Sequence, residues 1–299
     1  MPLTWLPCKS KGITESVPFE ALSWNSRMSD LPVLGAAMCV KHLPQHREWL
    51  LELPRDLELQ DFYNWKLLDN GCDDLIAEAK KLLDGHEGRL GLHGPFYNMD
   101  LSAADPLFQQ AVRKRLDQGI ELCAKMGADQ MVLHSPYTIW DHNNLDVYDN
   151  GRQMKLEMIH ANLKDVVAKA EGMGCVIVLE NIEDLDPSYR MDILKSFDSE
   201  ALALSIDTGH AHYMHSCYGA PPIDYFIKSA GNTLEHVHIQ DIDGYADRHW
   251  NPGEGSIPWE PLFAELAKLT SNPRLILEIM DETTLRKGAD YLVGLGVAR

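Results

Sequence analysis

The segment DPLFQQAVRKRLDQGIELCAKMGADQMVLHS (105–135) reads as one helix followed at once by one strand. Asp105 and Pro106 are typical of the N-cap and first position of a helix, and Gly127 is typical of its end. Between them, apolar residues recur near helical spacing: Leu107, Val112, Leu116, Ile120 and Cys123. The run QMVLHS (130–135) is short and apolar and ends beside a histidine, which predicts a buried strand.

The same unit recurs along the chain, because short apolar runs are each followed by a longer helical pattern. The eight runs are VLGAAMCV (33–40), LELQDF (57–62), RLGLHG (89–94), QMVLHS (130–135), VIVLEN (176–181), ALSIDT (203–208), EHVHIQD (235–241) and LILEIM (275–280). Nearly continuous apolar strands that alternate with helices are typical of a parallel sheet covered by helices, and eight units indicate a closed (β/α)8 TIM barrel. A doubly wound open sheet is the alternative, but its GxGxxG and GxxxxGK[ST] motifs do not occur in the sequence.

Length and composition fit a single α/β domain. The chain has 299 residues, within the range of one barrel. We expect the catalytic barrel over 31–299 and an N-terminal extension over 1–30, where no period is seen. No basic leader or run of about 18 apolar residues occurs, so we expect a cytoplasmic protein without a membrane span.

Charge and cysteine content exclude several classes of protein. The formal charge of −18 repels phosphate backbones, so nucleic acid is not an expected partner, and a small molecule is. The six cysteines contain no C-x-x-C pair, which argues against a zinc ribbon or a disulfide framework. The oligomeric state stays open.

Polar side chains lie at the ends of six predicted strands: His93, His134, Glu180, Asp207, His238 and Glu278. Because the carboxyl ends of barrel strands converge on one mouth, we expect these residues to be neighbours there. His210, Asp247 and His249 follow the sixth and seventh strands closely and extend the set. A single histidine in such a place is more often a hydrogen-bonded mouth residue than a ligand. Five histidines and four carboxylates around one cavity, however, call for cations.

Mixed imidazole and carboxylate ligands suit zinc, manganese or iron(II), with zinc the first choice. Nine ligands are too many for one ion, so we expect two or three. Clusters of this kind clamp phosphoesters and generate a hydroxide nucleophile. The remaining histidines follow no strand-end rule, and we expect His236 to pack outside the barrel.

Several short motifs add a family resemblance: HGPF (93–96), VLHSPY (132–137), VLENIED (178–184), SIDTGHAH (205–212), HIQD (238–241), DRHWNPGEG (247–255) and LEIMD (277–281). Together they resemble the xylose isomerase-like barrel superfamily and, within it, the metal-dependent apurinic-site endonucleases of family 2. The resemblance implies a trinuclear zinc site. One ion would bind His93, His134 and Glu180, and Glu180 would bridge to a second. The second would also bind Asp207, His238 and Glu278, and a third would bind His210, Asp247 and His249.

The resemblance leads to a multinuclear zinc phosphoesterase as the main functional prediction, with Glu180, Glu278 and His210 as catalytic residues. We expect a small phosphate ester as substrate rather than duplex DNA, because the chain is acidic and its first loop, AAMCVKHLPQHREW (36–49), differs from the DNA-contacting loop of those endonucleases. Lys41 and Arg248 are the predicted phosphate contacts.

A sugar or sugar phosphate isomerase/epimerase is the alternative, since the superfamily contains such enzymes. They use one divalent metal on the subset Glu180, Asp207, His238 and Glu278. There two glutamates move protons beside a carbonyl. That reaction does not need His134, Asp247 and His249 as ligands. Their presence in the sequence therefore favours hydrolysis. A metal-dependent protein without catalysis is the third hypothesis and predicts an incomplete set.

Overall fold

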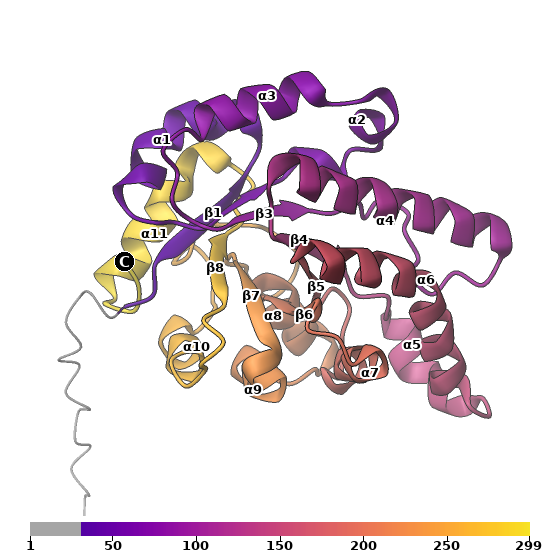
Figure 1. Ribbon diagram of the computed structural model, residues 1–299. Coiled ribbons are helices and arrows are strands. Elements are labelled where there is room, and N and C mark those ends of the chain that lie inside the picture. Colours follow the sequence, from indigo (N-terminus) through magenta and orange to yellow (C-terminus); the bar gives the residue numbers. More distant parts are fainter. Residues whose placement is uncertain (1–30) are drawn as a thin grey trace, which may run out of the picture. The chain divides into compact units, whose positions relative to one another are not determined.

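The computed structural model describes residues 31–299, which form a closed barrel of eight parallel strands in sequence order, surrounded by helices (Figure 1). The strands are β1 (Leu34–Met38), β2 (Leu57–Leu59), β3 (Leu90–His93), β4 (Gln130–His134), β5 (Val176–Glu180), β6 (Leu202–Asp207), β7 (Leu234–Ile239) and β8 (Arg274–Leu277). Each strand overlaps one predicted run, so the (β/α)8 prediction is confirmed. The extension predicted over 1–30 lies outside the described residues.

Helices and short 3-10 turns connect the strands. The helices are α1 (Leu43–Glu52), α2 (Trp65–Asn70), α3 (Asp73–Leu82), α4 (Pro106–Met126), α5 (Ile139–Asn144), α6 (Gly151–Met173), α7 (Ser188–Phe197), α8 (Thr208–Tyr218), α9 (Ile223–Ala230), α10 (Trp259–Leu266) and α11 (Leu285–Gly294). The 3-10 turns are η2 (Val40–His42), η3 (Asp61–Tyr63), η4 (Leu145–Val147), η5 (Gly231–Thr233) and η6 (Glu282–Thr284). The chain end meets the barrel start, because the Leu34 backbone N–H donates to the Arg299 carbonyl (2.9 Å).

Helix α4 begins and ends where the sequence predicts. The Asp105 side chain accepts a hydrogen bond from the Leu107 N–H (2.8 Å), and Gly127 adopts the left-handed conformation (φ 77°) that ends the helix. The apolar residues from Val112 onward are buried, whereas Leu107 is 77 % exposed although it shares their helical spacing. Leu107 lies in the first turn of α4, and the buried face starts at Val112.

Side chains at alternate strand positions fill the barrel interior, because residues two apart point to the same face. Val132, Val178 and Ala203 form a small buried cluster there, separate from the main core between strands and helices. Two residues further along each strand, the same face carries His134, Glu180 and Ser205. An apolar floor thus lies below a polar mouth.

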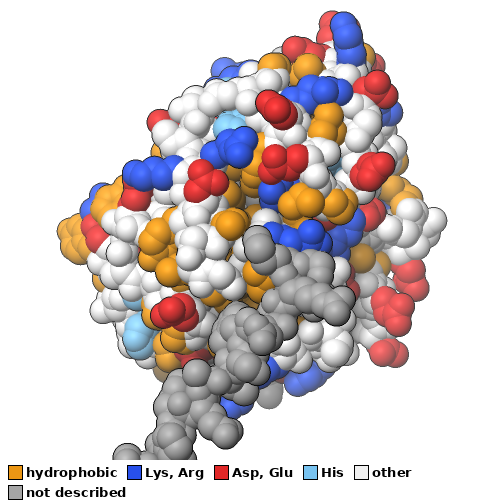
Figure 2. Space-filling view, turned by 90° about the vertical axis from the view of Figure 1, so that its left-hand side faces the viewer, with side chains coloured by type: hydrophobic (Ala, Val, Ile, Leu, Met, Phe, Trp, Pro, Cys, Tyr) orange, Lys and Arg blue, Asp and Glu red, His pale blue; other side chains and the backbone are white. Residues whose placement is uncertain are grey.

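The outside of the barrel carries many charged side chains. On the face shown in Figure 2, acidic and basic side chains are interspersed among the described residues. Arg115 of α4 pairs with Asp69 of α2 (2.7 Å), and Lys169 of α6 pairs with Asp117 of α4 (2.6 Å). Within residues 31–299, no helix is long and apolar enough to cross a membrane.

Arg190 of α7 holds the carboxyl ends of β5 and β6 together. Its guanidinium is buried (1 % exposed) and donates to the carbonyls of Leu179 (2.7 Å) and Ser205 (2.6 Å). Its Nε also lies 3.3 Å from an oxygen of the buried Asp184. The strands that end in Glu180 and Asp207 are therefore fixed next to each other by one buried cation.

We predict that Arg190→Met destabilises the barrel by roughly 3–5 kcal/mol, because it leaves Asp184 as an unpaired buried charge and two carbonyls without a donor. The free energy of unfolding, measured by chemical denaturation, tests this. Lys195→Met on the same helix is the control, since Lys195 is exposed and its loss should cost less than about 1 kcal/mol. Equal stability of the two variants would contradict the role of Arg190.

Candidate metal site at the barrel mouth

The structure brings all nine predicted ligand residues together at the carboxyl ends of the strands. They form three groups, and within each group one ligand atom per residue lies within 4.8 Å of the others. The groups are His93, His134 and Glu180; Glu180, Asp207, His238 and Glu278; and His210, Asp247 and His249. This grouping agrees with the one that the family resemblance implied, while metal binding by these residues stays a prediction.

Glu180 ends β5 and joins the first two groups. One of its carboxylate oxygens, Oε2, faces the Nε2 atoms of His93 (3.9 Å) and His134 (3.7 Å). Glu180 is 1 % exposed, and Oε2 has no hydrogen-bond partner in the described part of the chain. Because a buried oxygen without a partner is costly, this atom favours a bound cation between the two rings.

The second group surrounds the ring of His238 on β7. Its Nδ1 lies 3.1 Å from Glu180 Oε1 and 3.4 Å from Glu278 Oε2. Burial alone would lower the pKa of His238, but Glu278, Glu58 and Glu180 raise it well above its ordinary value. Burial, reinforced by the charges of Glu180 and Glu278, raises the pKa of Asp207 to about 6. The group therefore holds an excess of negative charge.

The third group lies beside the second, with His249 Nδ1 at 3.5 Å from Glu278 Oε2, and comes from the loop after β7 and the start of α8. Asp247 Oδ2 is 3.4 Å from His210 Nε2 and 3.2 Å from His249 Nε2. The Asp247 side chain is 46 % exposed, so this group is the most open of the three. Although burial lowers it, hydrogen bonding to Asp247 and the charge of Glu278 raise the pKa of His249 to about 9.

These features fit divalent metal ions. The raised pKa values of His238 and His249 mean that protons balance the carboxylates, and a bound cation would take the place of those protons. The imidazole and carboxylate donors suit zinc, manganese or iron(II). A closed structural zinc site would favour cysteine ligands, and none of the nine residues is a cysteine.

Gln240 connects the second and third groups, and sequence analysis missed it. Its side chain is fully buried, and Nε2 donates to Asp207 Oδ1 (3.1 Å) and Asp247 Oδ1 (2.9 Å). Its Oε1 accepts from the His249 N–H (2.8 Å). Gly209 makes room for it, because a Cβ there would lie 2.4 Å from the Gln240 amide carbon. A polar residue two positions after His238 was the available signal.

Asp241 shapes the loop that carries Asp247 and His249. Its carboxylate accepts hydrogen bonds from the backbone N–H groups of Ile242 (2.9 Å), Gly253 (2.8 Å) and Ile257 (3.1 Å) and from the Trp259 ring N–H (3.2 Å). A Cβ at Gly255 would lie 2.4 Å from Asp241 Oδ1 and 2.2 Å from the Ile242 carbonyl oxygen. Gly255 of the DRHWNPGEG motif therefore lets the loop fold tightly onto this carboxylate.

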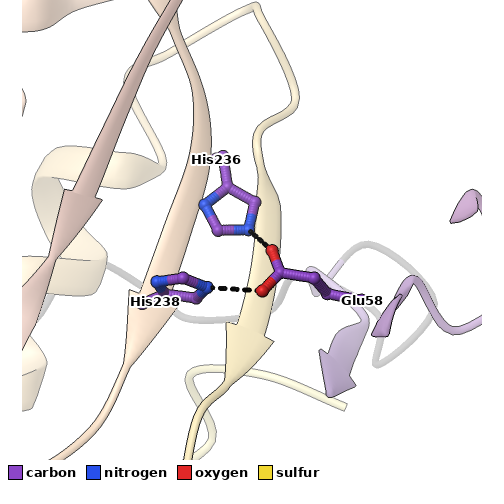
Figure 3. Close-up of side chains that lie close together, drawn as sticks. All are labelled: Glu58, His236 and His238. Carbon is purple, nitrogen blue, oxygen red and sulfur yellow. Dashed lines mark hydrogen bonds and ion pairs between the residues drawn. The ribbon is translucent and has the colours of Figure 1, made fainter. Parts of the chain in front are cut away.

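His236 lies inside the barrel, so its predicted position outside is wrong. Residues two apart on a strand share a face, and His236 therefore points inward like His238. Its Nε2 is 3.1 Å from Glu58 Oε2 of β2, and Glu58, His236 and His238 form a fourth group of possible ligand atoms (Figure 3). Sequence analysis missed Glu58, although a carboxylate inside the run LELQDF was a signal.

The two predicted phosphate contacts are not members of these groups, although Arg248 stands between Asp247 and His249 in the sequence. Lys41 is exposed in η2. Arg248 pairs with Asp243 (2.9 Å), and its guanidinium lies 5.4 Å from the centre of the Trp250 ring. Substrate binding by Lys41 and Arg248 stays a prediction.

Aromatic side chains line one side of the mouth. The Phe96 ring stacks on His134 with centroids 4.5 Å apart, and Tyr63 lies 5.0 Å from Phe96. Tyr97 contacts Phe96 (4.4 Å) and is 57 % exposed. This wall gives the polar site an apolar border.

A parallel barrel with several groups of possible metal ligands at its mouth is typical of metal-dependent TIM-barrel proteins. The family model of the xylose isomerase-like TIM barrel matches residues 55–295. The chain belongs to this family.

Curated relatives and solved structures are also similar to the chain. It is 24 % identical to uncharacterized protein MJ1311 of Methanocaldococcus jannaschii over 223 residues, 70 % of this chain and 72 % of that protein. It is 28 % identical to fructoselysine 3-epimerase of Escherichia coli O157:H7 over 110 residues, 35 % of this chain and 38 % of the enzyme.

Among solved structures, a D-tagatose 3-epimerase-like protein superposes with a TM-score of 0.70 at 21 % identity, over 88 % of this chain and 96 % of its own. The TTHB071 protein from Thermus thermophilus, soaked with ZnCl2, superposes with a TM-score of 0.62 at 24 % identity, over 89 % and 99 % of the two chains. These likenesses confirm the fold.

We predict that Asp241→Ala loosens the loop after β7, because four hydrogen-bond donors lose their common acceptor. The free energy of unfolding should fall by roughly 2–4 kcal/mol, and limited proteolysis should cut the loop faster. Asp290→Ala, which removes an exposed carboxylate of α11, should change stability by less than about 1 kcal/mol. An Asp241→Ala variant as protease-resistant as the wild type would show that this carboxylate does not hold the loop.

Proposed function

We propose that the protein is a divalent-metal-dependent sugar isomerase or epimerase. The observation that carries this proposal is the second ligand group, in which Glu180 and Glu278 approach His238 Nδ1 from β5 and from the end of β8. Sequence analysis favoured phosphoester hydrolysis and kept this reaction as its alternative. The family match and the likeness to epimerases support the alternative better.

Glu180 and Glu278 would be the proton-transferring groups. One carboxylate takes the proton from the carbon beside the sugar carbonyl, and the electron pair moves to the carbonyl oxygen to give an enediolate. The other carboxylate returns a proton to a carbon of this enediolate. A divalent metal bound to the second group would stabilise the negative oxygens of the sugar.

The contacts of the two carboxylates fit this role. Glu278 Oε1 accepts a hydrogen bond from Gln60 Nε2 (2.6 Å), which fixes the carboxylate and leaves Oε2 on the His238 side. Glu180 Oε2 has no hydrogen-bond partner among the described residues. The aromatic wall of Tyr63 and Phe96 would keep water from the enediolate, which protects it from unselective protonation.

We expect the protein, loaded with Mn²⁺ or Zn²⁺, to exchange a carbon-bound proton of a ketose with deuterium from D2O, as followed by proton NMR. Glu180→Gln and Glu278→Gln should each lower the exchange rate at least about 100-fold, since each removes a proton-transferring carboxylate. Glu235→Gln is the control and should leave the rate unchanged, because Glu235 lies at the amino end of β7, away from the mouth. Absence of exchange across a panel of free and phosphorylated ketoses would contradict the proposal.

Phosphoester hydrolysis is the second candidate, because the first and third ligand groups exceed what a single-metal isomerase needs. In that reaction the mouth would hold two or three ions, and His249 would be required for one of them. His134, Asp247 and His249 would then be as important as Glu180.

Metal stoichiometry separates the two candidates. If the protein is an isomerase, we expect His249→Ala to keep one tightly bound metal per chain by elemental analysis and to weaken mainly sugar binding. We also expect the wild type to spare bis(p-nitrophenyl) phosphate. A wild type with two or three ions that hydrolyses this ester, and a His249→Ala variant that loses one ion together with that activity, would instead establish the second candidate.

A further inference from the structure

A buried carboxylate lies beneath the second ligand group and contacts two histidines of one strand. Glu58 of β2 is 2 % exposed, and His236 and His238 are fully buried. Figure 3 shows the Glu58 carboxylate facing both rings, and the distances are 3.1 Å from Oε1 to His238 Nε2 and 3.1 Å from Oε2 to His236 Nε2. Neither Glu58 nor His236 belongs to the nine predicted ligands.

The ring of His238 is held by a carboxylate at each nitrogen. Its Nδ1 faces Glu180 and Glu278, on the side where the metal would bind, while Nε2 faces Glu58. A carboxylate that accepts the Nε2–H bond leaves the lone pair on Nδ1, which is the form of imidazole that can ligate a metal from that side. The His236 ring lies nearly perpendicular to the His238 ring with centroids 4.5 Å apart, and this contact restricts rotation of the His238 ring.

Gln60 extends the same network to a second member of the ligand group. Its Nε2 donates to Glu58 Oε1 (3.1 Å) and to Glu278 Oε1 (2.6 Å). On the other side, His236 Nδ1 lies 2.8 Å from the hydroxyl of Ser205 on β6. Glu58 is thus connected, directly or through one side chain, to β6, β7 and the end of β8.

We propose that Glu58 is a positioning residue for the candidate metal site, which it serves by fixing the Nδ1-ligating form of His238 and, through Gln60, the orientation of Glu278. This inference rests on the metal-binding part of the proposed function and not on the sugar reaction. The contacts favour it over a metal ion bound by Glu58 itself, because Glu58 Oε1 accepts from the Gln60 amide and also faces His238 Nε2 (3.1 Å), so that both of its lone pairs are used.

The test is the affinity of the purified, chelator-stripped protein for Zn²⁺, measured by competition with a chromophoric chelator. Glu58→Gln keeps the shape of the side chain but removes its charge. Asp56→Asn is the matched control, since Asp56 is also a buried carboxylate next to β2 but pairs with Arg89 (2.6 Å). We expect Glu58→Gln to weaken the tightest Zn²⁺ site roughly 10- to 100-fold and Asp56→Asn to leave it unchanged.

The protonated nitrogen of His238 gives a readout that a purely structural role would not change. In the zinc-loaded wild type, histidine ¹⁵N NMR should show His238 protonated on Nε2, with the signal assigned by its loss in His238→Gln. In Glu58→Gln this signal should shift or split between forms, and Glu58→Asp should restore part of the zinc affinity. If Glu58→Gln does not fold, Gln60→Met should lower the affinity about 10-fold by releasing Glu278.

Two results would overturn the inference. One is an unchanged zinc affinity in the folded Glu58→Gln variant, and the other is the loss of a whole zinc equivalent, which would make Glu58 a ligand. Failure of the sugar reaction is separate, because weakened zinc binding in Glu58→Gln without any ketose exchange by the wild type would support the inference and reject the isomerase. A wild type that binds no zinc would reject both.

Discussion

The mouth of the barrel depends on the negative charge gathered around His238. Three carboxylates from different strands lie close to this fully buried ring: Glu180 at 3.1 Å, Glu58 at 3.1 Å and Glu278 at 3.4 Å. In a low-dielectric interior such a cluster is stable only when a cation balances it. A protonated imidazole can supply one charge, and a divalent ion supplies more and also fills the gap at Glu180 Oε2.

The barrel itself makes this concentration of charge possible. Closure brings the carboxyl ends of all eight strands to one side, and the period of two points every second side chain inward. Residues as distant in sequence as Glu58 and Glu278 thereby become linked through one amide, that of Gln60. Arg190 stabilises the same region from the helix side, because its guanidinium donates hydrogen bonds to carbonyls of β5 and β6.

The strands and the ligand residues at their ends could be read from the sequence, because both follow from local patterns. Apolar runs mark strands, and a polar residue at the end of such a run has only the mouth to enter. This rule does not identify Glu58 and His236, because they lie within their apolar runs and not at the ends of these runs. The even spacing between His236 and His238 would have been enough to place His236 on the inner face. The partners of Glu58 on β7, in contrast, become its neighbours only when the barrel closes.

Gln240 and Asp241 could not be assigned from sequence for a different reason. Their partners lie on the loop after β7, and the path of that loop is set by contacts with these two side chains themselves. Asp241 collects three backbone N–H groups and the Trp259 ring, while Gln240 ties Asp247 and His249 to Asp207. A local pattern indicates that such a loop carries ligands but contains no information about which carboxylate binds a metal and which binds backbone.

The three ligand groups differ in how firmly the fold holds them, and this difference bears on function. In the second group Glu180, Asp207 and His238 are at most 1 % exposed and come from three neighbouring strands, so their geometry is rigid. The third group depends on a loop, and its Asp247 side chain is 46 % exposed. A rigid deep group suits the proton transfer that a family can share, because that chemistry requires fixed carboxylates. An open group on a loop suits contacts that differ between substrates. The open third group is therefore compatible with the proposed isomerase, in which His210, Asp247 and His249 would bind the far end of the sugar.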